Sequence, residues 1–279
     1  MRISDNVKHC VCLVCTREMG ENGDHFYQYR GTAFFLQMGR RSRSEQSFLY
    51  LVTSRRNVLA AQQEGKLLWL RINSHQETAV YFSLQGRHWH FPNDPEVDAA
   101  VLLCPGFRNF RYQAIPYENC ATNEDLRSRG IGIGDELLVV GSFANQQGSQ
   151  KNMAIIRDGI IAAMPDEPLY NRQTGLPYSA YLTETRSTGG LRGSPVFACV
   201  DHDVDISKLA GRIRVRLLGL VRGHWDRDLA SSPFKMDAHE IEAMNHGIVT
   251  VTPITEVINL LHQEDTAQER RGEDPGSAV

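Results

Sequence analysis

The stretch RSTGGLRGSPVF at residues 186–197 contains the pattern from which the fold is inferred. Gly189 and Gly190 come first, a Gly-Ser-Pro triplet follows, and an apolar run with the length of a β-strand completes the stretch. Glycine and proline are the strongest local signals of a turn. The stretch therefore predicts a tight loop that leads into a strand, with the charged residue Arg192 inside that loop.

On both sides of this loop the chain consists of short apolar runs separated by Gly, Pro and Asn. Many short strands with turns between them are typical of β-barrels and β-sandwiches. A polar, glycine-rich stretch at residues 123–134 divides the runs into two series. The first series comprises residues 9–15, 31–38, 47–53, 66–72, 79–84, 98–104 and 114–117, and the second comprises residues 136–143, 152–161, 180–185, 194–200, 212–221 and 247–253.

Helical patterns are rare in this chain. The stretch TPITEVINLLHQ, residues 252–263, predicts a helix with Pro253 in its first turn and Thr252 as a candidate N-cap. Its apolar residues recur at helical spacing: Ile254, Val257, Leu260 and Leu261. A weaker helical pattern, RRNVLAAQQ, follows Thr53. Residues 263–279 are mostly charged or small, so we expect a disordered tail.

The composition limits the classes of function. The chain has 279 residues, which suits one large domain or two small ones. Its formal net charge of −3 gives no general argument for nucleic acid or for a membrane surface. No apolar run reaches the length of about 18 residues that a membrane span needs, and no signal-peptide pattern is present. We therefore expect a cytoplasmic protein without nucleic-acid or membrane partners.

Three of the six cysteines crowd into CVCLVC, residues 10–15. A zinc site would need a second, suitably spaced cluster of ligands, and the sequence has none. We predict free thiols in the core, with Cys10 and Cys12 on one face of a strand and Cys15 on the other. No metal and no cofactor is expected.

Six stretches in the right order carry a resemblance to soluble bacterial trypsin-like peptidase domains, and it spans residues 7–262. Residues 31–36 resemble the GTGF strand of these domains, residues 50–58 the stretch with the catalytic histidine, residues 94–103 the stretch with the catalytic aspartate, residues 189–197 the nucleophile loop, and residues 217–225 and 245–261 the last strands and the terminal helix. The resemblance implies an all-β fold with two six-stranded antiparallel Greek-key β-barrels of the chymotrypsin type and a C-terminal α-helix. The barrels are expected at residues 7–116 and 134–262, the second including the helix, with a linker at 117–133.

The resemblance also assigns the three catalytic positions. Serine-protease chemistry needs a hydroxyl nucleophile, an imidazole general base and a buried carboxylate that orients the imidazole. The aspartate position is Asp98, which is retained, whereas the histidine position is Arg56 and the serine position is Arg192. A guanidinium, with a pKa above about 12, cannot serve as a general base at neutral pH. Ser194 lies two residues past the nucleophile position, so the resemblance implies a pseudoprotease.

The same comparison implies substrate-binding positions at Gly190, Gly193, Ser194 and Arg186. The oxyanion hole would use the backbone N–H groups of Gly190 and Arg192. Arg186 would form the base of the specificity pocket, where it would favour an acidic side chain or a chain terminus. Alternatively, Arg186 makes a surface salt bridge, for instance to Glu184.

Two further questions stay open at the level of sequence. A relocated catalytic group would have to come from His88, His90, His25 or Ser187, although His88 and His90 also fit a solvent-facing alternation in a hairpin. Arg56 is expected to form an ion pair with Asp98. Arg192 then has three alternatives: it fills and closes the cleft, it joins Arg56 in binding a small anion, or it is an inert plug.

The function expected from these residues is that of a catalytically inactive trypsin-like homologue. It would bind a protein or a peptide, for instance by adding an extended segment to a strand edge beside the cleft. A place in a bacterial defence or signalling assembly rests on analogy alone. The alternatives are an active serine endopeptidase with a non-standard triad, and an anion or nucleotide sensor that uses Arg56 and Arg192.

Overall fold

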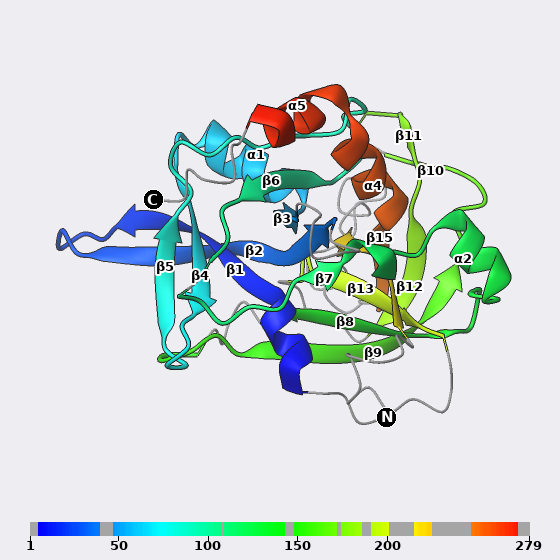
Figure 1. The fold of residues 1–279 in the computed structure, drawn as a ribbon, viewed down its shortest axis with the longest axis horizontal. Helices are drawn as coiled ribbons and strands as arrows, with labels where there is room; N and C mark the ends of the chain where they lie inside the picture. The colour runs from blue at the N-terminus through cyan, green and yellow to red at the C-terminus, as the bar shows by residue number, and fades with distance from the viewer. Residues whose placement is uncertain are drawn as a thin grey trace, which may run out of the picture.

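The computed structural model describes residues 5–39, 47–107, 109–142, 148–171, 174–185, 191–200, 215–224 and 247–272. Within these ranges the chain is mostly β, with two groups of strands and helices on the outside (Figure 1). The first group comprises η1 (Asp5–Cys10), β1 (Val11–Met19), β2 (His25–Met38), β3 (Phe48–Thr53), α1 (Arg55–Gln63), β4 (Leu68–Asn73), β5 (Ala79–Ser83), β6 (Ala100–Cys104) and β7 (Ile115–Pro116).

A short connection, with η2 (Tyr117–Asn119) and α2 (Asn123–Ser128), leads to the second group. This group comprises β8 (Glu136–Ser142), β9 (Ala154–Ala163), β10 (Leu169–Tyr170), β11 (Pro177–Tyr178), β12 (Tyr181–Thr185), β13 (Pro195–Cys199), β14 (Val215–His224), β15 (Ile248–Pro253), α4 (Ile254–His262) and α5 (Glu264–Gly272). Its strands close into a six-stranded barrel in the order β12-β15-β14-β13-β8-β9, and every pair in it is antiparallel. One closed barrel and a C-terminal helix are thus present as predicted.

The first group differs from the prediction, because its strands form a seven-stranded sheet and not a second closed barrel. The order is β5-β4-β1-β2-β3-β6, and β7 pairs in parallel with β2. Between β5 and β6 the chain runs through turns and bends, and only an isolated bridge joins His90 to Val101 of β6. Pro92 and Pro95 lie in this connection, and proline has no N–H to donate to a ladder. The expected two-barrel architecture is therefore supported for the second half alone.

Alternation along β6 divides the core into two parts. Ala100, Leu102 and Cys104 pack in the cluster that α1 covers, whereas Val101 and Leu103 pack in the cluster shared with the barrel and α4. A strand that is buried on both faces in this way reads as a continuous apolar run, which is what AVLLC is. Because β6 is fixed on both faces, the residues immediately before it are held in place as well.

The thiol prediction is right for burial and wrong for the strand faces. Cys12 and Cys15 lie in β1, but Cys10 ends η1 and belongs to the other core cluster than Cys12. All six cysteines are free, and burial raises the pKa of Cys10 and of Cys15 to about 12. A thiol in such surroundings is inert as a nucleophile at neutral pH.

The helices confirm two predictions and correct two. The weak pattern after Thr53 is α1, and the C-terminal pattern is α4, but the N-cap of α4 is Pro253 and not Thr252. The predicted disorder is wrong for the residues of α5. This helix has acidic residues in its first turn and basic residues in its last, which suits the helix dipole, and Arg270 Nη1 donates to Tyr50 Oη over 2.8 Å. No described helix has the length and apolar character that crossing a membrane requires.

Candidate functional site

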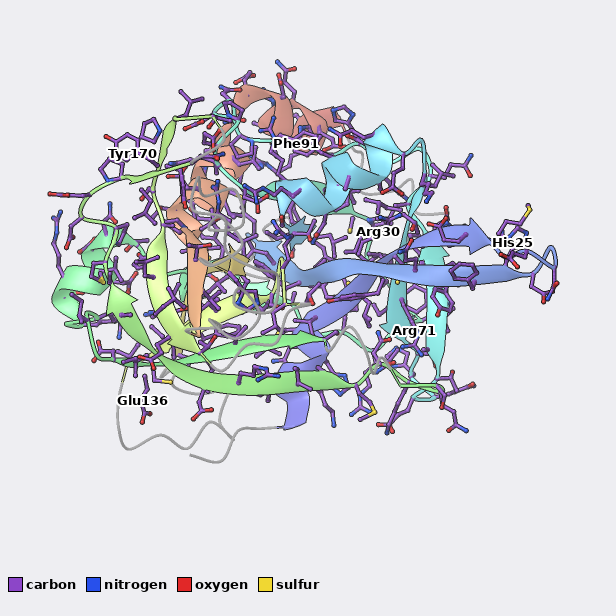
Figure 2. All side chains as sticks on the ribbon, turned by 180° about the vertical axis from the view of Figure 1, so that it is seen from behind. His25, Arg30, Arg71, Phe91, Glu136 and Tyr170 are labelled. Atoms are coloured by element: carbon purple, nitrogen blue, oxygen red, sulfur yellow. The ribbon has the colours of Figure 1, made fainter. Side chains whose placement is uncertain are left out.

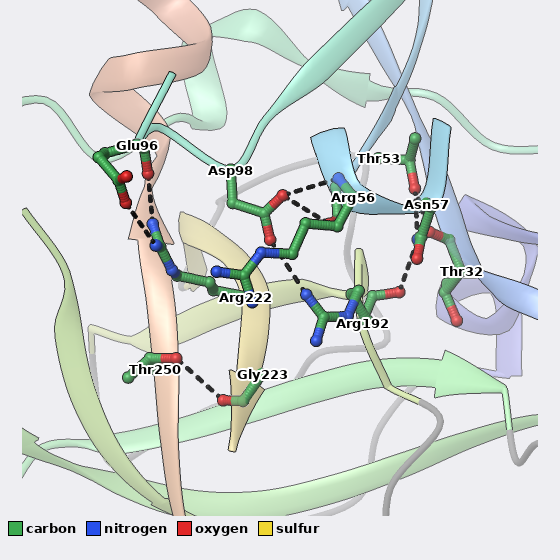
Figure 3. Close-up of polar contacts among 11 residues, drawn as sticks. Thr32, Thr53, Arg56, Asn57, Glu96, Asp98, Arg192, Arg222, Gly223 and Thr250 are labelled. Carbon is green, nitrogen blue, oxygen red and sulfur yellow. Dashed lines mark hydrogen bonds and ion pairs between the residues drawn. The ribbon is translucent and has the colours of Figure 1, made fainter. Parts of the chain in front are cut away.

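Asp98 lies just before β6, and its carboxylate is buried at the N-terminus of α1 (Figure 3). Its Oδ1 accepts a hydrogen bond from Ser54 Oγ over 2.7 Å and another from the backbone N–H of Arg56 over 3.0 Å. The first N–H groups of a helix have no partner within the helix, and the helix dipole favours a negative charge there. Since α1 has no acidic residue in its own first turn, Asp98 supplies that charge from another segment.

Arg192 completes the surroundings of this carboxylate. Its Nη1 lies 3.4 Å from Asp98 Oδ2, and the two side chains are 21% and 3% exposed. On the other side its guanidinium lies against β14, since a Cβ built at Gly223 would come within 3.2 Å of Arg192 Nη2. Arg192 thus reaches across the site to Asp98.

The predicted ion pair between Arg56 and Asp98 is not the one that the structure contains. Arg56 contacts the carboxylate through its backbone N–H, while its side chain is exposed. Among the described residues no carboxylate pairs with the Arg56 guanidinium; the ion pair of Asp98 is with Arg192. The reason is geometric: at the start of a helix the backbone N–H groups point along the axis towards the carboxylate, and side chains point outwards.

The loop around Arg192 is a tight turn, as predicted. Ser194 donates its backbone N–H to the carbonyl of Leu191 over 2.9 Å, and Gly193 has φ of +82°. A glycine with positive φ at the third position is what such a turn requires. A Cβ at Gly193 would also come within 2.2 Å of the carbonyl oxygen of Thr32, so no other residue fits without a shift of the backbone.

Backbone hydrogen bonds clamp this turn between the first sheet and the barrel. The carbonyl of Arg192 accepts from the N–H of Thr32 over 2.9 Å and from Asn57 Nδ2 over 3.3 Å. Gly193 donates to the carbonyl of Val221 over 2.8 Å. The backbone of Arg192 is thereby fixed to β2, α1 and β14 at once, and its side chain is aimed at Asp98 (Figure 3).

The two serines beside the site are both buried. Ser54 has no exposed surface, and its hydroxyl donates to Asp98. Ser194 is likewise buried, packs against Gly141, and has no hydrogen-bond partner for Oγ among the described residues. Neither hydroxyl is accessible to a substrate. Ser194 therefore acts in packing the turn onto β8.

None of the histidines considered as replacements is a hydrogen-bond partner of Asp98. His25 lies at the protruding end of the hairpin that β1 and β2 form (Figure 2). His90 is buried, and its Nε2 lies 2.6 Å from Glu269 of α5. His88 is exposed, with its ring 4.9 Å from that of His90. The solvent-facing alternation expected for this pair therefore holds for His88 and is wrong for His90, which α5 covers.

Three residues assigned to the loop before Leu191 lie outside the described residues, namely Arg186, Ser187 and Gly190. The predicted floor of the specificity pocket, the predicted oxyanion-hole N–H of Gly190 and the alternative nucleophile fall on them. Those assignments stay predictions.

A second buried ion pair lies beside the first and was not predicted. Arg222 is 5% exposed, donates from Nη1 to the backbone carbonyl of Glu96, and places Nη2 3.4 Å from the Glu96 carboxylate. Its guanidinium also lies over the ring of Tyr178, with Cζ 3.8 Å from the ring centroid. Burial acts to raise the pKa of Glu96, but hydrogen bonds from Asn171 and Thr174, together with Arg222, hold it below its usual value.

A β-bulge explains the direction of Arg222. Along the pairing of β14 with β15 the register shifts between Val221 and Gly223, so Arg222 is the extra residue. A bulge turns a side chain out of the regular alternation, and bulges are frequent beside functional sites. The available signal in the sequence was an arginine within the apolar run LLGLVRGH, since a charge in such a run needs a buried partner.

Comparison of the chain with models of known protein families gives no match, and comparison with curated proteins gives none either. The structure is compatible with a chymotrypsin-like fold, because it is mostly β, contains a closed six-stranded barrel and has a helix after the last strand. Among the described residues, the Asp98 carboxylate contacts a guanidinium, a buried hydroxyl and a backbone N–H.

Proposed function

We propose that the chain is a catalytically inactive homologue of trypsin-like serine peptidases that acts by binding a protein or a peptide. The observation that carries the proposal is the contact of 3.4 Å between Arg192 Nη1 and Asp98 Oδ2. In a serine peptidase the buried carboxylate orients an imidazole that takes a proton from serine. Here the carboxylate meets a guanidinium, which does not deprotonate at neutral pH.

The contacts around Asp98 and Arg192 favour a relation to such peptidases and speak against a chance resemblance. Asp98 is buried and accepts two hydrogen bonds from the start of α1, and the turn at Arg192 is fixed to both halves of the chain. Such polar clusters are costly to bury unless every member is paired. Their presence without an accessible serine beside them among the described residues fits a scaffold that is retained for binding.

The open first sheet offers the means of binding an extended segment. A sheet that does not close has edge strands, and a peptide that adds to an edge gains backbone hydrogen bonds. At one edge, Val101 of β6 already exchanges two hydrogen bonds with His90, over 2.8 and 3.0 Å. The edge at β5 makes one such contact, from the N–H of Ala79 to the carbonyl of Gln150 over 2.7 Å, and the rest of β5 is the candidate edge for a peptide. A role in a bacterial defence or signalling assembly would follow from such a partner and rests on analogy.

A fluorophosphonate probe tests the proposal, because an activated serine attacks its phosphorus and displaces fluoride. The natural chain is compared with the double variant Arg56→His and Arg192→Ser, and with that variant carrying Asp98→Asn as the matched control. We expect no labelling of the natural chain. Labelling of the natural chain at a serine would overturn the proposal and favour an endopeptidase with a relocated triad.

A second candidate is an anion or nucleotide sensor, and one observation favours it: the guanidinium of Arg56 is exposed and unpaired among the described residues. Against it, the charge of Arg192 is already balanced by Asp98. The sensor would show saturable binding of inorganic phosphate that Arg56→Met abolishes. The binding module would show none.

A further inference from the structure

A pocket of about 380 Å³ lies beside the site, on the other side of the segment that leads to Asp98. Residues 92–97 form one wall, the segment around β11 a second, and α4 a third. Its lining residues include Pro92, Asp94, Pro177, Tyr178 and Glu256. A volume near the lower end of the range for ligand pockets, about 300–1,000 Å³, suits one or two side chains of a partner.

A hydrogen bond, a cation–π contact and three prolines hold the walls of the pocket in place. Arg55 Nη1 donates to the carbonyl of Pro92 over 3.0 Å, which fixes one wall to α1. Tyr178 is held from behind by Arg222, whose guanidinium lies over its ring. Prolines at 92, 168 and 177 restrict the backbone of the rim. A pocket formed in advance binds with a smaller loss of conformational entropy than one that must be ordered.

The charged side chains that line the pocket are acidic. Asp94 and Glu256 contribute carboxylates, and no Lys, Arg or His occurs among its described lining residues. Burial raises the pKa of Glu256, and the negative charge of Asp94 raises it further, while a hydrogen bond from Asn259 acts the other way. A cation close to such a carboxylate favours its charged form.

We propose that this pocket binds the protonated amine or guanidinium of a basic side chain, presented by the peptide or protein partner of the proposed function, on which this inference rests. The acidic walls hold the charged end, and the prolines of the rim pack against the aliphatic stem. Because residues 92–97 line the pocket and also carry Glu96 of the buried cluster, a partner bound here would lie next to the Asp98 site.

The test uses the full chain and three capped tripeptides, Ac-Gly-Lys-Gly-NH₂, Ac-Gly-Arg-Gly-NH₂ and Ac-Gly-norleucine-Gly-NH₂, together with free n-butylamine. Binding is followed by NMR titration of backbone amides. The variants are Glu256→Gln and Asp94→Asn, and Glu124→Gln is the matched control because Glu124 is also in the first turn of a helix, α2, outside the pocket lining. Thermal unfolding of each variant is recorded in addition to the titration.

We expect the lysine and arginine peptides to shift amides of the pocket, with affinities at least about tenfold above that of the norleucine peptide. Glu256→Gln should weaken binding by about three- to tenfold, Asp94→Asn should weaken it as well, and Glu124→Gln should leave it unchanged. The unfolding temperature of Glu256→Gln should equal or exceed that of the natural chain, since a site residue is not optimised for stability.

Equal binding of the norleucine and lysine peptides would overturn the inference, as would binding that both Glu256→Gln and Asp94→Asn leave unchanged. If butylamine binds as tightly as the lysine peptide, the pocket is a cation site, and the proposal that a peptide supplies the cation is overturned. Failure of the proposed function gives a different result, namely labelling of the natural chain by the fluorophosphonate while these titrations are unaffected.

Discussion

Arg192 and Asp98 form an ion pair between the turn before β13 and the segment before β6, with Nη1 and Oδ2 3.4 Å apart. The carboxylate is buried and the guanidinium is partly exposed. Removing one partner of such a pair leaves a buried charge without its counter-ion. The pair therefore ties the turn at Arg192 to the start of α1 and to the segment before β6.

Arg192→Met should lower the free energy of unfolding by about 1–2 kcal/mol, less than for a fully buried pair, because Ser54 and the N–H of Arg56 still donate to Asp98. Arg56→Met is the control, since that side chain is exposed, and its effect should stay within about 0.5 kcal/mol. Urea unfolding at pH 7 measures both. Equal effects would mean that the ion pair does not stabilise the fold.

Gly193→Ala should destabilise the chain by more than about 2 kcal/mol, since it combines an unfavourable φ of +82° with a Cβ that would lie 2.2 Å from the carbonyl of Thr32. Gly86→Ala is the matched control, because its φ is +74° but no atom lies within 4 Å of the added Cβ. The control should cost only about 1 kcal/mol. Thermal and urea unfolding of both variants separate the steric part from the conformational part.

The pKa of Glu96 gives a prediction for stability against pH. Its pKa in the folded chain lies below the usual value of 4.5, so its contribution is fully present above that value and is lost as the pH falls through the folded pKa. Glu96→Gln should therefore reduce the loss of stability below pH 4.5 while lowering stability at pH 7. Unfolding midpoints from pH 7 to pH 3 measure this. A parallel decline in both proteins would contradict the assignment.

Helix α5 contributes to stability through Arg270, whose Nη1 donates to Tyr50 Oη and to the carbonyl of Leu261, over 2.8 and 2.6 Å. Arg270→Met should cost about 1–2 kcal/mol, because two partly buried acceptors lose a charged donor. The neighbouring Arg271→Met should stay within about 0.5 kcal/mol, since Arg271 pairs with Glu264 at the exposed surface. Equal unfolding midpoints would show that α5 is not anchored by Arg270.

Much of the architecture could be predicted from periodicity. The continuous apolar run of β6 and the helical spacing of α4 are strong patterns because burial selects them directly. Whether the first sheet closes into a barrel could not be predicted. Closure depends on whether the connection through Pro92 and Pro95 forms a further hydrogen-bonded strand. The helix α5 could not be predicted either, because its sequence has little to bury and the helix is held by polar contacts to distant residues.

At the site, the resemblance to trypsin-like domains predicted which residues come together and not how they pair. Asp98, Arg56 and Arg192 all meet, but the guanidinium on the carboxylate belongs to Arg192, because α1 presents Arg56 by its backbone. The direction of a long side chain follows from local backbone geometry. Arg222 was missed for the same reason, since a one-residue bulge decides where it points.

The most direct measurement is an incubation of the purified natural chain, at an amount equal to the substrate, with a broad peptide library, followed by mass spectrometry of new peptide termini. The Asp98→Asn variant, purified identically, controls for contaminating proteases. No new termini are expected from the natural chain beyond those of that control, because the Asp98 carboxylate pairs with the Arg192 guanidinium, which cannot act as a general base or a nucleophile. New termini from the natural chain that disappear in Asp98→Asn would contradict this expectation.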